Sequence, residues 1–465
     1  MTELFDRRHP EPTAASGQTE VIGSQGQNRA MESLKSAIEE ARGRYASANP
    51  ASQAADRNAA TSLPGGNTRT VLHFEPFPLT MAGGEGAELI DIDGHRYIDC
   101  VGEYSAALFG HSDPVIKAAI NQALEEGVAM GAPTQYERTL AGLLCQRYPS
   151  VDQVRFCNSG TEANLMALST ARVVTGRSKL LAFRDGYHGG VIKFLGGRCA
   201  LNVPFDFELA DYNDIDGTAE IVDRHGDDLA AVVVEPILGA GGNIQGNREF
   251  LHMLRRKTRE IGALLIFDEV KTARLGPGGV QGMIGINPDL TTLGKFIGGG
   301  LPTGAFGGSR EVMEHFDPRQ KGALAHAGTF NNNVCSMAAG CAALSEVYTA
   351  EFAADFLDRS EAFRLSLNEM FARTAVPMYA NGLGSMIAIH FSREPTKRPG
   401  DITPGCRSLR PLLHMELLLD GMLVCTRGDL FLSLPMEESH LSRARECLER
   451  FVHRYQPLIE QVLKA

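Results

Sequence analysis

Three groups of residues with the chemistry of a cofactor site follow one another along the chain. Ser159–Thr161 is a polar turn that opens a helix-like segment, and Leu264–Glu269 is an apolar run that ends in carboxylates. Lys295 comes next, just before a glycine triplet at residues 298–300. A lysine amine, an acid for a pyridinium nitrogen and donors for a phosphate are what a protein must supply to hold pyridoxal 5'-phosphate, PLP. The order of these groups therefore predicts a PLP-dependent enzyme.

The acid and the phosphate site each have a second interpretation. Asp268 ends a strand of apolar residues, where an unpaired carboxylate is costly, so its partner is either a protonated pyridine ring or an arginine. Ser159, Gly160 and Thr161 offer hydroxyls and free amides at a helix N-terminus, an arrangement that attracts anions. The alternative for this turn is an N-cap without a ligand. The conjunction with Lys295 favours the PLP interpretation.

An aromatic residue lies between these groups in the chain. Tyr187 belongs to Asp185–Gly190, where glycines let the backbone approach a ligand and expose the ring. Stacking of the ring on the cofactor is the functional interpretation, and packing within a loop is the alternative. We expect His188 to have a local structural role rather than to carry a proton. Lys295 is not the lysine of a nucleotide-binding loop, because Phe296 stands where that loop needs Ser or Thr.

Composition excludes several other classes of function. The chain has 465 residues, of which 43% are hydrophobic and 22% charged, as in ordinary globular enzymes. Its net charge of −11 and pI near 5.7 argue against binding to nucleic acid or to an anionic membrane. Nine cysteines without a Cys-x-x-Cys pair suggest neither a disulfide framework nor a zinc site, so no metal is expected. We expect a cytoplasmic protein without a membrane-spanning segment.

Hydrophobic patterning predicts the elements that position these residues. From about residue 115, apolar runs alternate with helical segments, which is typical of an α/β fold with a mainly parallel central sheet covered by helices on both faces. The predicted strands are Gln153–Cys157, Lys179–Phe183, Ala230–Val234 and Leu264–Phe267. Open α/β sheets bind ligands beyond the carboxyl ends of their strands. The residues found there are Ser159, Tyr187, Glu235 and Asp268.

The regions on either side of this sheet are expected to form a smaller α+β domain. Residues 1–30 are predicted to be a flexible tail, and a helix is predicted from near Met31 within an N-terminal segment over residues 31–114. In that segment, residues 88–99 have the pattern of two strands joined by an Asp-Gly turn. The large PLP-binding domain is expected over residues 115–345. A C-terminal part of the small domain over 346–465 would include strands near 385–391 and 430–434.

These motifs resemble those of one enzyme family. The segments Asn158–Asn164, Gly186–Gly190, Val233–Pro236, Phe267–Val270 and Gly294–Gly300 are similar to those of class III, fold-type I PLP-dependent aminotransferases. Within that class the chain resembles the β-amino acid (β-phenylalanine) aminotransferases and glutamate-1-semialdehyde aminomutase. The resemblance extends from about Tyr45 to about Phe451. Leu238, residues 129–132 and Lys271-Thr272 depart from the family pattern, so the shape of the substrate pocket does not follow from it.

The resemblance implies a role for each matching residue in a homodimer with shared active sites. Lys295 would form the internal aldimine with PLP and move the proton, and Asp268 would hold the pyridinium. The phosphate would be bound by Ser159, Gly160 and Thr161, with Tyr187 stacked on the ring, Glu235 in the nearby carboxylate network and Thr329 reaching the phosphate of the neighbouring subunit. Arg69 and Arg427 match carboxylate-binding positions, since a guanidinium binds a carboxylate bidentately.

Three functions remain open at this point. The leading one is a transaminase that takes the amine of a β-amino acid with an aromatic or other apolar side chain and passes it to 2-oxoglutarate. The second is an aminomutase, which moves the amine within one molecule. The third is a catalytically silent PLP-binding protein, which would need neither Lys295 nor Asp268. The three asparagines of Gly328–Asn333 favour the β-amino acid enzymes.

Overall fold

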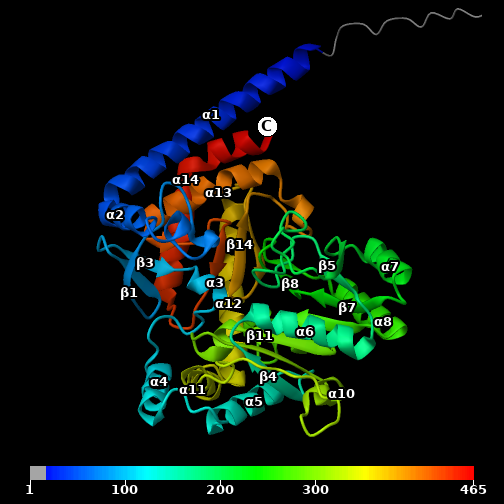
Figure 1. The fold of residues 1–465 in the computed structure, drawn as a ribbon. Helices are drawn as coiled ribbons and strands as arrows, with labels where there is room; N and C mark the ends of the chain where they lie inside the picture. The colour runs from blue at the N-terminus through cyan, green and yellow to red at the C-terminus, as the bar shows by residue number, and fades with distance from the viewer. Residues whose placement is uncertain (1–16, 465) are drawn as a thin grey trace, which may run out of the picture.

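The computed structural model describes residues 17–464, and its largest element is a seven-stranded sheet (Figure 1). The strand order is β4-β12-β11-β10-β7-β5-β6. These strands are β4 Gln153–Cys157, β5 Lys179–Phe183, β6 Asp206–Ala210, β7 Leu229–Val234, β10 Leu264–Asp268, β11 Leu290–Gly294 and β12 Gly304–Gly308. Only β12 runs antiparallel to its neighbours, so the prediction of a mainly parallel sheet is confirmed.

Both faces of the sheet are buried beneath helices. On one face, Ala231, Val233 and Ile266 pack with α6 (Gly160–Thr175). On the other face, Val232, Val234, Leu265 and Phe267 pack with α8 (Arg248–Ile261), and α7 (Ile215–Arg224) lies beside α8. Strands buried on both faces need apolar residues at every position, which explains the continuous apolar runs of β7 and β10. The carboxyl ends of β4, β5, β7, β10 and β11 consequently share one edge.

The sequence predicted four strands of the seven-stranded sheet at nearly the observed positions and missed the other three. β4 and β5 have the predicted bounds, β7 begins one residue earlier and β10 includes Asp268. β6, β11 and β12 were not predicted. In β12 the glycines hid the strand, because glycine has low β propensity. They are needed for close packing: a Cβ at Gly304 would lie 2.1 Å from the Ser159 carbonyl oxygen, and one at Gly308 would lie 2.2 Å from that of Asp289.

The N- and C-terminal parts of the chain form smaller sheets together. One has the order β1-β2-β3-β15 and the other β13-β14-β16. Their strands are β1 Met81–Glu85, β2 Glu88–Asp91, β3 Arg96–Asp99, β13 Tyr379–Leu383, β14 Met386–His390, β15 Met422–Leu423 and β16 Asp429–Phe431. A separate two-stranded pair consists of β8 Ile237–Leu238 and β9 Ile244–Gln245. The hairpin predicted over residues 88–99 is present as antiparallel β2 and β3.

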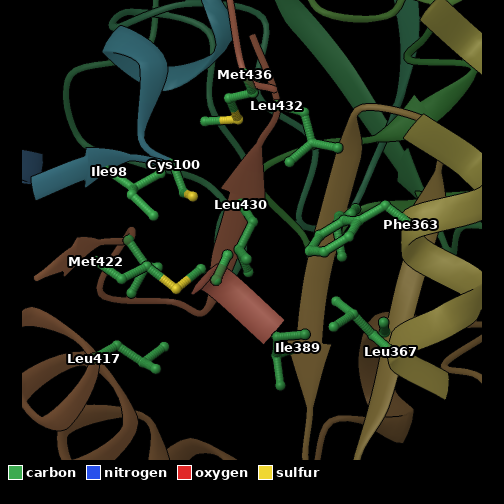
Figure 2. Close-up of a cluster of buried hydrophobic side chains, with 14 of the residues drawn as sticks. Ile98, Cys100, Phe363, Leu367, Ile389, Leu417, Met422, Leu430, Leu432 and Met436 are labelled. Carbon is green, nitrogen blue, oxygen red and sulfur yellow. The ribbon is translucent and has the colours of Figure 1, made fainter. Parts of the chain in front are cut away.

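One hydrophobic core joins residues that are more than 300 positions apart in the chain. Figure 2 shows Ile98 and Cys100 next to Met422 and Leu430. Parallel pairing of β15 with β3 brings these residues together. The figure also shows the side chains that α12, α13 and β14 contribute to the same core, among them Phe363, Leu367, Ile389 and Leu417. The C-terminal region therefore shares its core with the N-terminal strands.

The first helix is longer than the sequence predicted. α1 spans Gly17–Ala48, so the helix begins before the start predicted near Met31. The flexible tail expected over residues 1–30 stays a prediction, and residues 1–16 lie outside the described part. The sequence of residues 17–30 is mostly polar and has no apolar stripe, so it gives no periodic signal, although Gln, Glu, Arg and Ala favour helices. The later part of α1 packs on α13 and α14 through Leu34, Ala41 and Tyr45 (Figure 1). The domain boundaries stay a prediction.

The remaining helices surround these sheets. They are α2 Pro50–Ala59, α3 Gly102–Ser105, α4 Pro114–Glu126, α5 Gln135–Arg147, α9 Gly279–Ile284, α10 Arg310–Met313, α11 Val334–Ala342, α12 Ala350–Arg373, α13 Pro404–Leu419 and α14 Glu438–Lys464. Within residues 17–464, no helix combines the length and the apolar character that a bilayer crossing requires. The same residues contain no cluster of His, Cys, Asp and Glu suited to a metal ion.

Candidate active site

The two carboxylates at the end of β10 point to different places. The Glu269 side chain is fully buried and accepts hydrogen bonds from Thr272 Oγ1 (2.7 Å) and from the backbone amides of Val280 (3.0 Å) and Gln281 (2.8 Å). Its acceptor capacity is used within the fold, so Glu269 anchors the start of α9. Asp268 lies at the carboxyl edge of the sheet instead, which makes it the acid available to a ligand.

Asp268 is held by two buried polar side chains. Its Oδ2 accepts from Asn164 Nδ2 (2.9 Å) and faces His188 Nδ1 (2.8 Å), while Oδ1 accepts from the Val270 amide (3.1 Å). Burial by itself lowers the pKa of His188, but the hydrogen bond and the charge of Asp268 outweigh it and raise that pKa. Asn164 is fixed in turn, because its Oδ1 accepts from Thr292 Oγ1 (2.8 Å). The carboxylate is therefore held in one orientation.

Lys295 follows β11 in a strained backbone conformation. Its φ is +58°, in the left-handed region that side chains other than glycine rarely adopt and that is found at functional sites. Its Nζ donates to the Tyr104 carbonyl oxygen (2.9 Å). Burial, followed by the nearby charge of Lys271, lowers the pKa of Lys295 to about 8. A substantial share of the amine is therefore unprotonated and nucleophilic near that pH.

The turn that accepts from Lys295 is itself left-handed. Residues 102–105 have φ values between 48° and 77°, and such a conformation costs roughly 1–2 kcal/mol for each residue other than glycine. Asp99 Oδ1 accepts from the amides of Val101 and Gly102 (both 2.9 Å). The buried Arg274 donates Nη1 to the Ser105 carbonyl oxygen (3.0 Å). These bonds hold the Tyr104 carbonyl in place for Lys295.

The start of α6, Ser159–Thr161, is the predicted phosphate cradle. Ser159 caps the helix by accepting from the Glu162 amide (3.2 Å), as the N-cap interpretation predicts. Two neighbouring glycines keep the surroundings narrow: a Cβ at Gly160 would meet Val270 at 2.8 Å, and one at Gly189 would meet Thr161 Oγ1 at 2.4 Å. The backbone can thus come close to a phosphate whose charge the helix N-terminus favours.

A cavity of about 490 Å³ lies beside Lys295, a size typical of cofactor sites. Its charged and aromatic lining comprises Arg69, Tyr104, Tyr187, Lys193, Glu235, Lys271, Lys295 and Arg427; Asp268 and residues 159–161 do not line it. Tyr187 is 42% exposed, which leaves its side chain accessible for stacking. The structure therefore brings Lys295, Tyr187, Glu235 and both predicted arginines to one place. Thr329 is exposed and does not line this cavity.

Glu235 connects two loops at the cavity wall. Its Oε1 accepts from the Tyr187 amide (2.9 Å) and its Oε2 from the Gly239 amide (3.0 Å). Burial raises the pKa of Glu235 above its usual range. Glu235 therefore supports the loop that carries Tyr187. Asp268 contacts His188, the next residue of the same loop.

The two arginines have carboxylate partners of different kinds. Arg69 pairs with Glu103, whose side chain is 60% exposed, and lies over the Tyr104 ring. Arg427 pairs with Asp429 (Nη2 to Oδ2, 3.0 Å), whose side chain is almost fully buried, and that carboxylate raises the pKa of Arg427. An exposed carboxylate is exchanged for another one at little cost, whereas a buried one needs its partner. Arg69 is therefore the more mobile of the two guanidinium groups.

Sequence reasoning missed part of the site. His188, Asn164 and Tyr104 contact Asp268 or Lys295 but were not assigned to the site, and His188 was expected to have only a local role. Asn164 gave a usable signal, because an amide among the apolar positions of α6 must find a buried partner. The role of the Tyr104 carbonyl had no signal in its residue type, since any residue has a carbonyl group.

The residues fit PLP in its three parts. Asp268 offers an oriented carboxylate for a pyridinium nitrogen, and the start of α6 offers amides and hydroxyls for a phosphate. Lys295 offers an amine with a lowered pKa. These residues supply the lysine, acid and phosphate donors that PLP requires.

Comparison with known proteins agrees with this geometry. The sequence profile of the family described as aminotransferase class-III matches residues 73–452. The chain is 45% identical to a β-phenylalanine transaminase of Variovorax paradoxus over 90% of this chain and 96% of that one. A crystal structure of a β-phenylalanine aminotransferase from the same organism superposes with a TM-score of 0.90 over 91% of this chain and 99% of that one.

Other relatives have a second activity in their names. The chain is 41% identical to a glutamate-1-semialdehyde 2,1-aminomutase of Methanosarcina acetivorans over 72% of this chain and 82% of that one. A solved structure described as a transaminase with PLP bound is 30% identical, with a TM-score of 0.80 over 89% of this chain and 98% of that one.

Proposed function

The chain belongs to the class-III aminotransferases, and we propose that it moves the amino group of a β-amino acid to a keto acid such as 2-oxoglutarate. It is a PLP-dependent enzyme of fold-type I, so the silent binding protein is set aside. The observation that carries the substrate proposal is the presence of Arg69 and Arg427 in the same cavity as Lys295. Similarity to a β-phenylalanine transaminase supports it.

The residues around the cavity have different roles in the reaction. PLP supplies an electron sink when it is bound. Asp268, aligned by His188 and Asn164, keeps the positive charge on the ring nitrogen on which that sink depends. Lys295 carries the cofactor on Nζ and, once released, moves a proton to and from the substrate carbon. Its pKa of about 8 leaves a basic, unprotonated amine available for that transfer.

The geometry of a β-amino acid explains why two arginines are useful. Its carboxylate is one carbon further from the reacting amine than that of an α-amino acid. A site that accepts both a β-amino acid and 2-oxoglutarate must therefore bind carboxylates at more than one distance from Lys295. Arg69 comes from the N-terminal segment and Arg427 from the C-terminal one, so they flank the cavity from different elements. The apolar lining residues Val71, Leu195 and Ala240 suit an aromatic or aliphatic side chain.

The proposal includes a homodimer with shared sites, in which Thr329 serves the phosphate of the neighbouring subunit. Thr329 and Phe330 are exposed in one protomer, and Phe330 is 64% exposed, as expected of residues that a second subunit covers. The cytoplasmic location expected from the cysteine content stays a prediction.

A donor screen tests the substrate proposal directly. The purified holoenzyme is incubated with 2-oxoglutarate and a panel of α- and β-amino acids, and glutamate formation is followed. Glutamate should form fastest from β-amino acids with apolar side chains. Formation from α-amino acids alone would remove the β-amino acid part of the proposal. Isomerisation of glutamate 1-semialdehyde without amination of any keto acid would establish the aminomutase instead.

A further inference from the structure

Lys271 is a partly buried cation in the cavity wall, and it has no role in the reaction described above. Its ammonium makes no ion pair or hydrogen bond with any residue of the described range 17–464, and it lies 4.5 Å from the centroid of the Phe431 ring. Arg69 and Arg427, by contrast, are each paired with a carboxylate. Glu235 and Asp429 lie near this ammonium without pairing with it, so a ligand that brings negative charge into direct contact would stabilise it.

Lys271 faces one particular side of the cavity. A Cβ at Gly239 would lie 2.7 Å from Lys271 Nζ and 3.1 Å from Glu235 Oε2, so the amine lies on the side of the loop that follows β7. The preceding residue faces the other way, since a Cβ at Gly160 would meet the Val270 side chain. Val270 thus lies against the phosphate cradle and Lys271 opposite it.

The order of the strands in the sheet also places the phosphate cradle on one side of Asp268 and the loop after β7 on the other. β10, which carries Asp268, has β7 as one neighbour, and β4, which leads into α6, lies beyond its other neighbour. On the pyridine ring of PLP, the phosphate arm and the phenolic oxygen flank the carbon that bonds the lysine nitrogen. When the ring nitrogen lies at Asp268 and the phosphate at the start of α6, the phenolic oxygen must face the β7 side. That is the side of Lys271.

We propose that Lys271 binds the phenolic oxygen of PLP and thereby lowers the affinity of the Lys295 nitrogen for its proton. The phenolic oxygen shares that proton with the nitrogen. A cation beside the oxygen therefore favours the deprotonated form of the Lys295–PLP linkage. This inference rests on the proposed attachment of PLP to Lys295, but not on the identity of the amino donor.

The surrounding charges agree with this role. Around Lys271 lie Glu235 after β7, Asp429 on β16 and Arg427 before it, together with the Cys425 thiol. Around Lys295 lie Lys271, Asp268, Arg69 and Glu103. Arg69 and Arg427 are in ion pairs with Glu103 and Asp429, whereas Lys271 has carboxylates near it but is in no ion pair. After burial, Lys271 is the largest cause of the lowered pKa of Lys295.

The visible absorbance of the holoenzyme tests the inference without any substrate. The Lys295–PLP linkage changes its absorbance when its proton leaves, so a pH titration gives a midpoint. In Lys271→Met, the midpoint should rise by roughly one to two pH units, because a like charge a few ångströms away has been removed. Lys271→Arg should keep the wild-type midpoint. Lys193→Met is the matched control, since Lys193 lines the same cavity but is not among the charges around Lys295.

An unchanged midpoint in Lys271→Met would overturn the inference, and so would an equal shift in Lys271→Arg, which would indicate packing rather than charge. If Lys271→Met loses its visible band, Lys271→Gln, which keeps length and polarity, gives the same measurement. Failure of the attachment itself is recognised separately. Borohydride reduction followed by peptide mapping would then label a lysine other than Lys295, and Lys295→Ala would keep the band.

Discussion

Asp268 is the residue on which the buried polar network converges, and we propose that its carboxylate holds the pyridinium nitrogen of PLP. We expect Asp268→Asn to retain some PLP but to lose turnover by about 10²-fold or more, because electrostatic stabilisation of the developing charge is lost. Single-turnover kinetics with a good donor measure this. Glu269→Gln is the contrasting variant: it should lower the melting temperature while the folded fraction keeps its turnover. Near wild-type turnover in Asp268→Asn would show that another residue serves the ring nitrogen.

His188 gives the site a pH dependence of defined sign. Folding raises its pKa, so its contribution to stability is complete below its unfolded pKa of about 6.5 and is lost as the pH rises through the folded value. We therefore expect His188→Gln to destabilise the apoenzyme more at pH about 6 than at pH about 9. Thermal unfolding across that range checks the sign. A loss of stability that is the same at every pH would contradict it.

The two arginines should respond differently to removal. Arg69→Ala should raise the KM of at least one half-reaction roughly tenfold, the effect of one lost charge-assisted contact. It should leave thermal stability unchanged, because Glu103 is exposed. Arg427→Ala should raise a KM and also lower the melting temperature, because the buried Asp429 loses its partner. Both half-reactions and both melting curves are measured. Wild-type kinetics in both variants would end the two-arginine argument.

At this scale the sequence predicted residue types better than contacts. Lys295, Asp268 and Tyr187 were predicted from their types and neighbours and Arg427 from the family resemblance; the structure places Lys295, Tyr187 and Arg427 around one cavity and Asp268 against His188. The sequence already favoured Asp268, and the structure adds that Glu269 is used within the fold. The contact of His188 with Asp268 required knowledge of which loops meet, since the two residues are 80 positions apart.

Elements, rather than single residues, set the width of the phosphate cradle. Gly189 has a φ of +132°, and a Cβ there would lie 2.4 Å from Thr161 Oγ1 at the start of α6. We expect Gly189→Ala to displace that helix start, to cost roughly 1–3 kcal/mol of stability and to weaken PLP binding. Gly190→Ala is the matched control, because a Cβ at Gly190 meets no atom within 4 Å. Titration of each apoenzyme with PLP and thermal unfolding measure the two effects. Equal behaviour of the two variants would show that the cradle is not tight at Gly189.

The predictability of an element depended on what its sequence had to satisfy. β4, β5, β7 and β10 are apolar runs in which burial on both faces and strand period point to the same answer. In β12 the need for close backbone packing at Gly304 and Gly308 opposed β propensity, so the strand was hidden. The left-handed turn at residues 102–105 was hidden for a similar reason: its conformation is enforced from outside, by Asp99 and Arg274.

For the whole molecule, the sequence predicted the α/β fold class and a small domain built from both ends of the chain, but not how the ends pair. Parallel pairing of β15 with β3 and the packing of α1 on α13 and α14 depend on contacts between residues hundreds of positions apart. Hydrophobic periodicity identifies which face of an element is buried, and it does not identify the partner.

The largest-scale prediction concerns two molecules. If Thr329 serves the phosphate of the neighbouring subunit, inactive Lys295→Ala and a Thr329→Phe variant should complement each other. Half of the randomly re-formed dimers are hybrids, and each hybrid has one site with an intact lysine and an intact threonine from different subunits. About a quarter of the wild-type activity should therefore return after subunit exchange. Wild-type enzyme mixed with Lys295→Ala controls for exchange. If Thr329 served its own subunit, no hybrid site would be complete and no activity would return; full activity in a monomeric species would likewise refute sharing.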